Sequence, residues 1–324
     1  MRESRLLEHV ARTASRSSAV VVPPGDDLAA VQVPAGAVLL GVDQVVDGVH
    51  VDLARVSVEA AGRKAIARCV SDVAAMAGRP VASLAAVVLP RDFTEERTLR
   101  LFDAVRQAAD ACEAPLVGGD IAVHAGGDGP LVLSVSVLGV PGPAGIIRRN
   151  GARPGDLVCV TGRLGGSLEP GGGGRHLSFT PRVAAGLELA ERLGSRLHAM
   201  MDLSDGLGRD AGRMAAASGV AMRLEAERLP RHEGIDWRGA VGDGEDYELL
   251  FTLDGEPPAS VAGVDCTVIG RVEPADPAGG WPAGVVRLRL GGAAGPGEDA
   301  GAWIDIRESG WEHRDGGGTS GADT

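Results

Sequence analysis

The stretch "SVEAAGRKAIARCVSDVAAMAG" (residues 57–78), followed by "VASLAAVVLP" (81–90), decides the fold class. The first part has the apolar spacing of a helix, and the second is an apolar run typical of a buried strand. One face of this helix carries Ala65, Cys69, Asp72 and Met76. A carboxylate within that apolar stripe needs a partner, because an unpaired buried charge is costly. An arginine, a backbone donor or a metal ion would each serve.

The rest of the chain alternates strand-like and helix-like stretches in the same way. Further strands are predicted at 37–46, 115–120, 129–140, 156–162, 221–230, 246–253 and 267–272. Further helices are predicted at 95–114, 181–193 (with Pro181 at its start) and 206–219. The pattern predicts an α+β (mixed α/β) protein in which each half is a mixed sheet with packed helices.

A segment rich in glycine and proline (140–156) separates the two halves, and the length of 324 residues also favours two domains. We expect an N-terminal domain at 1–145 and a C-terminal α/β domain at 146–313. The glycine-rich end, 314–324, is expected to be a disordered tail.

Composition limits the possible partners. A formal net charge of -12 argues against nonspecific nucleic-acid binding. The four cysteines are far apart without a CxxC motif, so neither a zinc site nor a disulfide framework is expected. No apolar run approaches the ~20 residues of a membrane span. Residues 1–16 have the pattern of an amphipathic helix rather than a secretion signal, and we therefore expect a cytoplasmic protein.

Aspartates recur beside glycine or serine. The segments are "PPGDD" (23–27), "VSDV" (70–73), "VGGD" (117–120), "LSDG" (203–206) and "GDGED" (242–246). Any one of them is explained by a turn or a helix cap. Asp202 and Asp205 either cap the helix that follows them or hold a cation. Asp43 ends an apolar run, and a parallel strand would deliver it to a site. Taken together, these oxygen ligands suit Mg²⁺ or Mn²⁺, which bridge to substrate phosphates.

The kind of phosphate chemistry is partly limited by missing motifs. There is no GxxxxGK[ST] sequence and no HRD or DFG signature, which excludes a P-loop and a protein kinase. The glycine-rich turn "VTGRLGGS" (160–167) is a weak candidate for binding phosphate through backbone N–H groups. Arg149 would contact phosphate or only be solvated, and a single histidine such as His50 is more often structural than functional.

Several of these segments resemble those of the thiamine-monophosphate kinase family, in the same order. They are "GDDLAAV", "GVDQVVDGVHV", "GRKAIARCVSDVAAMAGRP", "VGGD", "RNGARPGDLVCVTGRLGGS", "MDLSDGLGRD" and "GDGEDYELLFT". The resemblance runs from about Gly25 to Gly270. It implies the two-domain aminoimidazole ribonucleotide synthetase-like fold and ATP-dependent phosphorylation of thiamine monophosphate to thiamine diphosphate. It also implies several Mg²⁺ ions and a homodimer formed through the N-terminal domains.

The resemblance also assigns roles to residues. The implied metal ligands are Asp27, Asp43, Asp72, Asp120, Asp202 and Asp205. The implied nucleotide-binding residues are Gly119, Asp120, Arg149 and Ser204. The implied substrate-binding residues are His50, Glu245 and Trp311, although a plain packing role for Trp311 is equally consistent with the sequence. No covalent nucleophile or dedicated base is expected, because a phosphate monoester has a second pKa near ~6 and is mostly dianionic at pH 7. Direct in-line transfer between Mg²⁺-held phosphates then suffices.

Two segments depart from the family pattern. Gly41-Val42-Asp43 stands where the family has two hydroxyl residues before the aspartate, and segment 168–182 is short and glycine-rich. They leave two alternatives open. One is another ATP-dependent enzyme of the same superfamily, acting on a different small phosphate. The other is a metal–nucleotide binder without catalysis.

Overall fold

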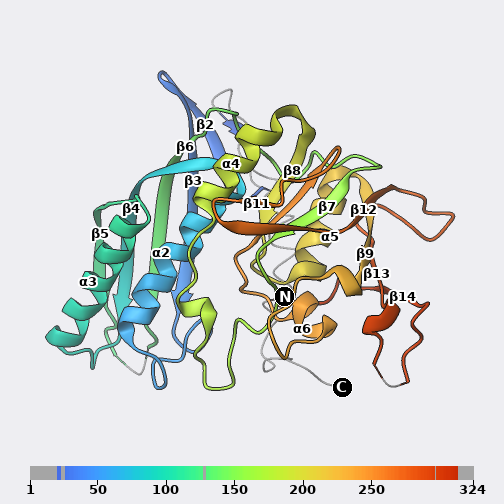
Figure 1. Ribbon diagram of the computed structural model, residues 1–324. Coiled ribbons are helices and arrows are strands. Elements are labelled where there is room, and N and C mark those ends of the chain that lie inside the picture. Colours follow the sequence, from blue (N-terminus) through green and yellow to red (C-terminus); the bar gives the residue numbers. More distant parts are fainter. Residues whose placement is uncertain (1–19, 23–25, 127–128, 296, 313–324) are drawn as a thin grey trace.

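The computed structural model of the chain contains two β-sheets, each with its own helices (Figure 1). It describes residues 20–22, 26–126, 129–295 and 297–312. The helix expected at 1–16 and the tail expected at 314–324 lie outside these residues. In the described part of the chain, no helix combines the length and apolar character that a membrane crossing requires.

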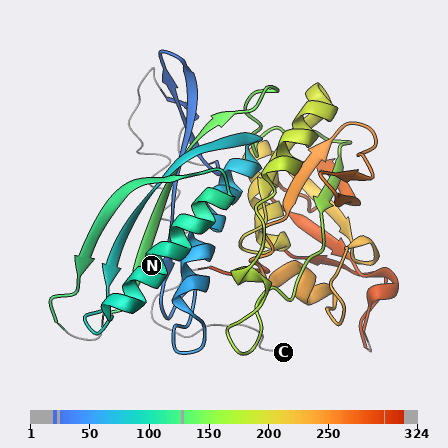
Figure 2. The ribbon, with the colours of Figure 1, turned by 60° about the vertical axis from the view of Figure 1, so that its left-hand side comes forward.

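The N-terminal sheet has six strands in the order β1-β2-β3-β6-β4-β5. Their bounds are β1 Val20–Val22, β2 Ala29–Val33, β3 Gly36–Val46, β4 Gly78–Leu89, β5 Leu116–Val123 and β6 Val132–Pro141. Only the β4–β5 pair is parallel among the strand pairs described in this sheet. Helices α2 (Val58–Ala75) and α3 (Glu95–Ala111) cover one face (Figure 2). The strands and helices predicted from periodicity in this half are confirmed.

The helices of this half begin where their capping residues predict. The Ser57 hydroxyl accepts a hydrogen bond from the Ala60 N–H at the start of α2, and Thr94 does the same for Arg97 in α3. Leu101 and Val105 of α3 are fully buried against α2 and the sheet. These side chains lie on the apolar face of α3, which is the face that enters the core.

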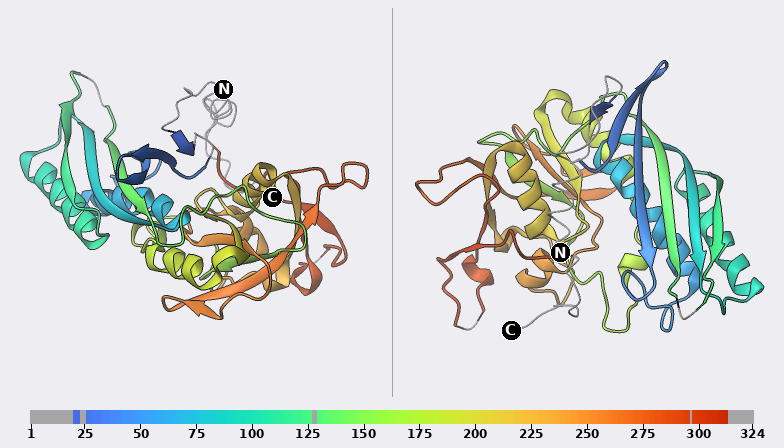
Figure 3. Two further views of the ribbon diagram at one scale, coloured as in Figure 1. Left: turned by 90° about the horizontal axis from the view of Figure 1, so that it is seen from above. Right: turned by 180° about the vertical axis from the view of Figure 1, so that it is seen from behind.

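Three local predictions are wrong. The strand predicted to be buried, β4, is covered on one face only, and Val81 and Leu84 are 42% and 48% exposed. The other face of the sheet carries no helix of the described chain (Figure 3, right). Asp43 does not end a parallel strand, because β3 continues to Val46 and pairs antiparallel with β2 and β6. Pro181 precedes its helix, since α4 (Val183–Leu193) has Arg182 as its N-cap residue.

The C-terminal sheet has the strand order β14-β13-β9-β12-β7-β10-β8, with β11 paired to β12. The bounds are β7 Leu157–Thr161, β8 Leu197–Asp202, β9 Val220–Glu225, β10 Leu249–Leu253, β11 Ser260–Val261, β12 Val264–Pro274, β13 Val286–Arg289 and β14 Trp303–Asp305. Helices α5 (Leu207–Ser218) and α6 (Trp237–Gly242) pack on one face, and α4 packs on the other. Because both faces are covered, every residue of β7 is buried, as its continuous apolar run indicates.

The two halves meet along α2. Ala74 and Ala77 at the end of this helix join the core that α4 forms with the C-terminal sheet. The Ser71 hydroxyl of α2 donates a 2.6 Å hydrogen bond to the Asp202 carboxylate at the end of β8. The polar residue Ser71 of α2 is therefore held against the carboxyl end of β8.

Candidate active site

Three carboxylates from distant parts of the sequence meet at this junction. Asp27 precedes β2, Asp72 lies on α2, and Asp202 is the last residue of β8. One oxygen of each lies within 4.8 Å of one oxygen of the other two. The sequence predicted all three as metal ligands, and the fold brings them together although about 130 residues separate the second from the third.

The electrostatics of this cluster disfavour three negative charges. Burial, followed by repulsion from Asp43 and Asp202, raises the pKa of Asp72 well above its usual range. Burial and the charge of Asp27 also raise the pKa of Asp202. Burial raises the pKa of Asp27 to about 6, although the nearby Arg149 opposes the shift. Such a cluster favours protons or a cation, as metal sites do.

Asp43 and Asp205 flank the cluster. The Asp43 carboxylate lies 3.6 Å from the Arg68 guanidinium, and its pKa is raised by burial and by the charges of Asp205 and Glu245. Asp205 pairs with Arg213 at 2.5 Å. These two predicted metal ligands therefore lie beside the triad, and each has an arginine partner.

The capping hypothesis for Asp202 and Asp205 is wrong. The N-cap residue of α5 is Gly206, and no side chain caps it. The buried carboxylate of Asp210 instead reaches back and accepts hydrogen bonds from the backbone N–H groups of Ser204 (3.0 Å) and Asp205 (2.9 Å). Asp210 fixes the turn that carries Asp205, and our sequence analysis missed it. Its spacing of five residues from Asp205, one turn into a predicted helix, was the available signal.

The Ser204 turn is joined to the loop that carries Glu245. The Glu245 N–H donates to the Ser204 carbonyl, the Tyr247 N–H to the Leu203 carbonyl, and the Leu203 N–H to the Glu248 carbonyl, each at 2.8 Å. Glu245 and Tyr247 have φ angles of +54° and +52°. Left-handed backbone is strained for residues other than glycine, and it persists only where the surroundings enforce it.

Glu245 belongs to a buried polar cluster. Its Oε2 atom lies 2.5 Å from Nζ of Lys64 and 3.0 Å from Nδ1 of His176. Although burial opposes ionisation, the contacts with His176 and Lys64 lower the pKa of Glu245 to about 2. Lys64, the only lysine of the chain, is fully buried and also donates to the His50 carbonyl at 2.8 Å. No role was predicted from the sequence for Lys64 or His176.

The predicted substrate residues His50 and Trp311 come together from opposite ends of the sequence. Their ring centroids lie 6.2 Å apart with a tilt of 52°. The Trp311 N–H donates to the Asp205 carbonyl at 2.9 Å, which fixes the C-terminal segment beside the carboxylate cluster. Trp311 keeps 38% of its surface exposed, so it is not part of a core.

Gly119 and Asp120 are not brought to this site within one chain. They lie on β5, which β6 and β4 separate from β3, and Asp120 is in register with Ala86, an exposed residue of β4. Three strand spacings of ~4.8 Å place Asp120 roughly 14 Å or more from β3. The presence of glycine at position 119 has a structural explanation, because a Cβ there would overlap the backbone carbonyl of Ala85.

The departure at Gly41 and Val42 has a steric explanation. Gly41 lies on the inner face of β3, where an added Cβ would be 3.9 Å from the Asp72 carboxylate but would overlap the Leu28 side chain. Val42 points to the exposed face of the sheet. Leu28 therefore fills the space beside Asp72 that a side chain at position 41 would need.

Two backbone N–H groups of the glycine-rich turn at 160–167 are already bonded within the protein. The Gly165 N–H donates to the Asp246 carboxylate at 3.0 Å, and the Gly166 N–H donates to Asp243 at 2.7 Å. The suggestion that this turn binds phosphate through these two backbone groups is therefore wrong. They hold the loop 242–248 in place instead.

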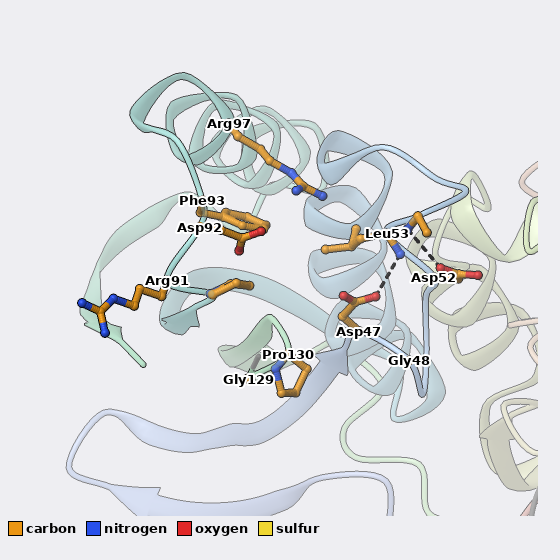
Figure 4. Close-up of a pocket in the computed structure, with 12 residues that line it drawn as sticks. Asp47, Gly48, Asp52, Leu53, Arg91, Asp92, Phe93, Arg97, Gly129 and Pro130 are labelled. Carbon is orange, nitrogen blue, oxygen red and sulfur yellow. Dashed lines mark hydrogen bonds between the residues drawn. The ribbon is translucent and has the colours of Figure 1, made fainter. Parts of the chain in front are cut away.

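A cavity of about 920 Å³ lies elsewhere, where β3 and β4 end near the starts of α2 and α3 (Figure 4). Two of its polar side chains already have partners: Asp47 accepts from the Leu53 N–H at 2.9 Å, and the Arg97 guanidinium stacks 4.2 Å from the Phe93 ring centre. None of the clustered aspartates lines it. We therefore place the candidate active site at the carboxylate cluster rather than in this cavity.

Known proteins are similar to this chain in sequence and in fold. The model of the AIR synthase related protein N-terminal domain matches residues 25–141, and the model of the corresponding C-terminal domain matches 153–257. The chain is 36% identical to the thiamine-monophosphate kinase of Rhodopirellula baltica over 71% of this chain and 74% of that protein. It is 33% identical to that of Aquifex aeolicus over 77% and 86%. The solved structure of AaThiL complexed with AMPPCP and TMP is 29% identical, with a TM-score of 0.75 and 97% of each chain covered.

The paired domains and the carboxylate cluster between them place the molecule in the AIR synthase related class. The fold class predicted from the sequence is thereby confirmed. Within that class, the chain belongs to the thiamine-monophosphate kinase family. The resemblance seen in the sequence is confirmed.

Proposed function

We propose that the protein transfers the γ-phosphoryl group of ATP to thiamine monophosphate, giving thiamine diphosphate and ADP. The observation that carries the proposal is the cluster of Asp27, Asp72 and Asp202, three carboxylates within 4.8 Å in a member of this family. The AMPPCP and TMP held by AaThiL support ATP and thiamine monophosphate as the two ligands.

The residues present fit Mg²⁺. The Oδ2 atom of Asp27 is buried without a hydrogen-bond partner, and carboxylate oxygens are the ligands that Mg²⁺ prefers. Asp27, Asp72 and Asp202 would hold it, with Asp43 and Asp205 beside them. Bound Mg²⁺ offsets the negative charge of the phosphates and of the group in transit.

We assign the remaining residues by the charge that each presents. Arg149 and Ser204, beside the cluster, bind the nucleotide phosphates. Glu245, ionised at neutral pH, faces the cationic thiazolium ring of the substrate. His50 and Trp311 form an aromatic wall against which a flat cation is favourable.

The transfer needs no covalent intermediate and no dedicated base. A phosphate oxygen of thiamine monophosphate attacks the γ-phosphorus while the bond to the β-phosphate oxygen of ATP breaks, and ADP leaves. The acceptor is already mostly dianionic at pH 7. The protein therefore acts by aligning two polyanions and excluding water.

We also propose a homodimer formed through the N-terminal sheets. The uncovered face of that sheet exposes the apolar side chains of Leu40, Val42 and Leu84. An exposed apolar surface of this kind is typical of an interface. Since Asp120 lies on β5 of the same sheet, we propose that it acts at the cleft of a second copy. The four cysteines are free, which supports a reducing, cytoplasmic location.

The first experiment is an assay of the purified protein with ATP, Mg²⁺ and thiamine monophosphate. The proposal requires thiamine diphosphate and ADP in equal amounts. ADP without thiamine diphosphate would favour another ATP-dependent enzyme of the superfamily. Mg²⁺-dependent ATP binding without turnover would favour a metal–nucleotide binder.

A mixing experiment tests the homodimer and the role of Asp120. Asp120→Asn and Asp202→Asn should each be inactive alone. In a mixed dimer, one cleft would combine an intact Asp202 with an intact Asp120 of the other copy, so coexpression should restore a measurable fraction of activity. A monomer in sedimentation, or no recovery in mixed dimers, would refute the assignment.

A further inference from the structure

Segment 167–182 contacts the loop Glu245–Glu248 at each of its four residues. The contacts are His176 with Glu245, Ser167 with Asp246, Phe179 with Tyr247 and Arg182 with Glu248. The rings of Phe179 and Tyr247 stack at 3.9 Å with an interplanar angle of 9°. A segment that resembles a shortened surface loop in the sequence is therefore packed along the whole loop Glu245–Glu248. We call this loop the substrate loop, because it carries Glu245, a proposed substrate-binding residue.

This loop requires such support. Two of its residues have positive φ angles, a conformation that costs of order 1–3 kcal/mol each when the residue is not glycine. Its backbone is held on one side only by the 203–204 turn. The side chains of segment 167–182 hold the other side. Two guanidinium nitrogens of Arg182 donate to the two carboxylate oxygens of Glu248, at 2.8 and 2.5 Å.

His176 is the central contact. It is 1% exposed, and its Nε2 atom lies 3.2 and 3.1 Å from the carbonyl oxygens of Gly172 and Gly173. Because carbonyls only accept, Nε2 carries the hydrogen. The Nδ1 atom lies 3.0 Å from the Glu245 carboxylate and 2.8 Å from Nζ of Lys64, which can donate to both. The ring and Lys64 together thus connect the backbone of the glycine-rich segment to the carboxylate of Glu245.

The same segment is also attached to the N-terminal half. Arg63 donates to the Ser178 carbonyl at 2.8 Å, and Arg55 donates to the Pro170 carbonyl at 3.2 Å. Lys64, which shares Glu245 with His176, lies one residue after Arg63 on α2. The segment therefore connects α2 with the loop that carries Glu245.

We propose that segment 167–182 positions Glu245, with His176 as the positioning residue, and that it sets the affinity for the cationic acceptor rather than for the nucleotide. The part of this proposal that concerns the substrate rests on the function proposed above. The part that concerns the ordering of the loop does not. The carboxylate triad is held by contacts that do not involve this segment, which is why the nucleotide side should be spared.

Two substitutions separate the two sides of the ring. His176→Asn keeps a polar group near the position of Nδ1, whereas His176→Gln keeps one near Nε2 and loses the contact with Glu245. We expect His176→Gln to raise KM for thiamine monophosphate about tenfold and to leave KM for ATP within about twofold. His176→Asn should raise the first KM by a smaller factor. A matched control is His198→Gln, because His198 also contacts a buried carboxylate, Asp156, at 2.9 Å, but away from the loop.

A second measurement does not depend on turnover. Amide hydrogen exchange of the peptide 243–248 should be faster in His176→Gln than in the wild type and unchanged in His198→Gln. Failure of the wild type to make thiamine diphosphate would refute the proposed function, while the exchange result would still decide the positioning role. Unchanged exchange, equal increases in both KM values, or the reverse order of the Asn and Gln variants would overturn the inference.

Discussion

Replacing Asp202 with asparagine removes one charge from the carboxylate triad with almost no change in shape. Asparagine also keeps an oxygen that can accept the hydrogen bond from the Ser71 hydroxyl. The substitution therefore separates charge from packing. Without metal it should stabilise the protein, and with Mg²⁺ and ATP it should remove both the stabilisation by ligand and the activity.

The magnitude follows from the geometry. At an effective dielectric constant of about 20, two unit charges 4.8 Å apart repel by roughly 3.5 kcal/mol. Arg149, 2.7 Å from Asp27, and partial protonation of the buried carboxyls reduce the net repulsion. We expect Asp202→Asn to add about 1–3 kcal/mol of stability without metal. At about 2 °C per kcal/mol for a chain of this size, Tm should rise by roughly 2–6 °C.

The assay is thermal unfolding in EDTA and in saturating Mg²⁺ with a non-hydrolysable ATP analogue, together with turnover. A ligand at a hundred times its Kd adds about 2.7 kcal/mol, or about 5 °C, to the wild type, and this gain should vanish in Asp202→Asn. Turnover should fall by about 100-fold or more. The matched control is Asp254→Asn, which should behave as wild type. Asp254 is an exposed aspartate that directly follows the last residue of β10. A variant that is destabilised in EDTA, or that keeps the gain from Mg²⁺, would refute a metal role for Asp202.

Three further predictions concern the surroundings of the cluster. Asp210→Ala leaves the N–H groups of Ser204 and Asp205 without their acceptor, so urea unfolding should show a loss of about 2–3 kcal/mol and turnover should fall at least tenfold; a loss below 0.5 kcal/mol would contradict this. Gly41→Ser should lower Tm because the side chain overlaps Leu28, and Leu28→Ala in the same chain should recover part of that loss, whereas additive losses would contradict the steric explanation. Burial raises the pKa of Asp246 from 3.8 to about 7, and a carboxyl with a raised pKa loses its contribution to stability as the pH rises through that value. From pH 5 to 8 the wild type should therefore lose about 2 kcal/mol more than Asp246→Asn; equal losses would show that Asp246 does not titrate there.

The long elements of the fold could be predicted because periodicity is a local property, whereas the short elements β1, β2, α6, β13 and β14 were not predicted. The helix at 57–78 and the strand at 37–46 are seen in their own residues. The exposed face of β4 could not be predicted, because an apolar run does not show whether one or two faces of a strand are covered. That face depends on which helices pack on the sheet.

Only part of the site was predicted, for a similar reason. The aspartates were found through the resemblance, since spacing alone does not show that Asp27, Asp72 and Asp202 meet. Residues that act on other residues were missed. Asp210 caps a turn, and His176 reaches a carboxylate 69 positions further along the sequence from a segment that resembles a deletion. Such roles depend on long-range contacts, which a single sequence does not specify.

The arginine partners show which carboxylates of the site have no compensating positive charge. Three aspartates of the site have an arginine partner: Asp27 with Arg149 at 2.7 Å, Asp43 with Arg68 at 3.6 Å, and Asp205 with Arg213 at 2.5 Å. Among the residues that the structure describes, Asp72 and Asp202 form no ion pair, and the charges that shift their pKa values most are those of other carboxylates. Buried charges are stable only when they are paired. The unpaired charge therefore lies at the centre of the cluster, beside the unbonded oxygen of Asp27, which is where a divalent cation would gain most.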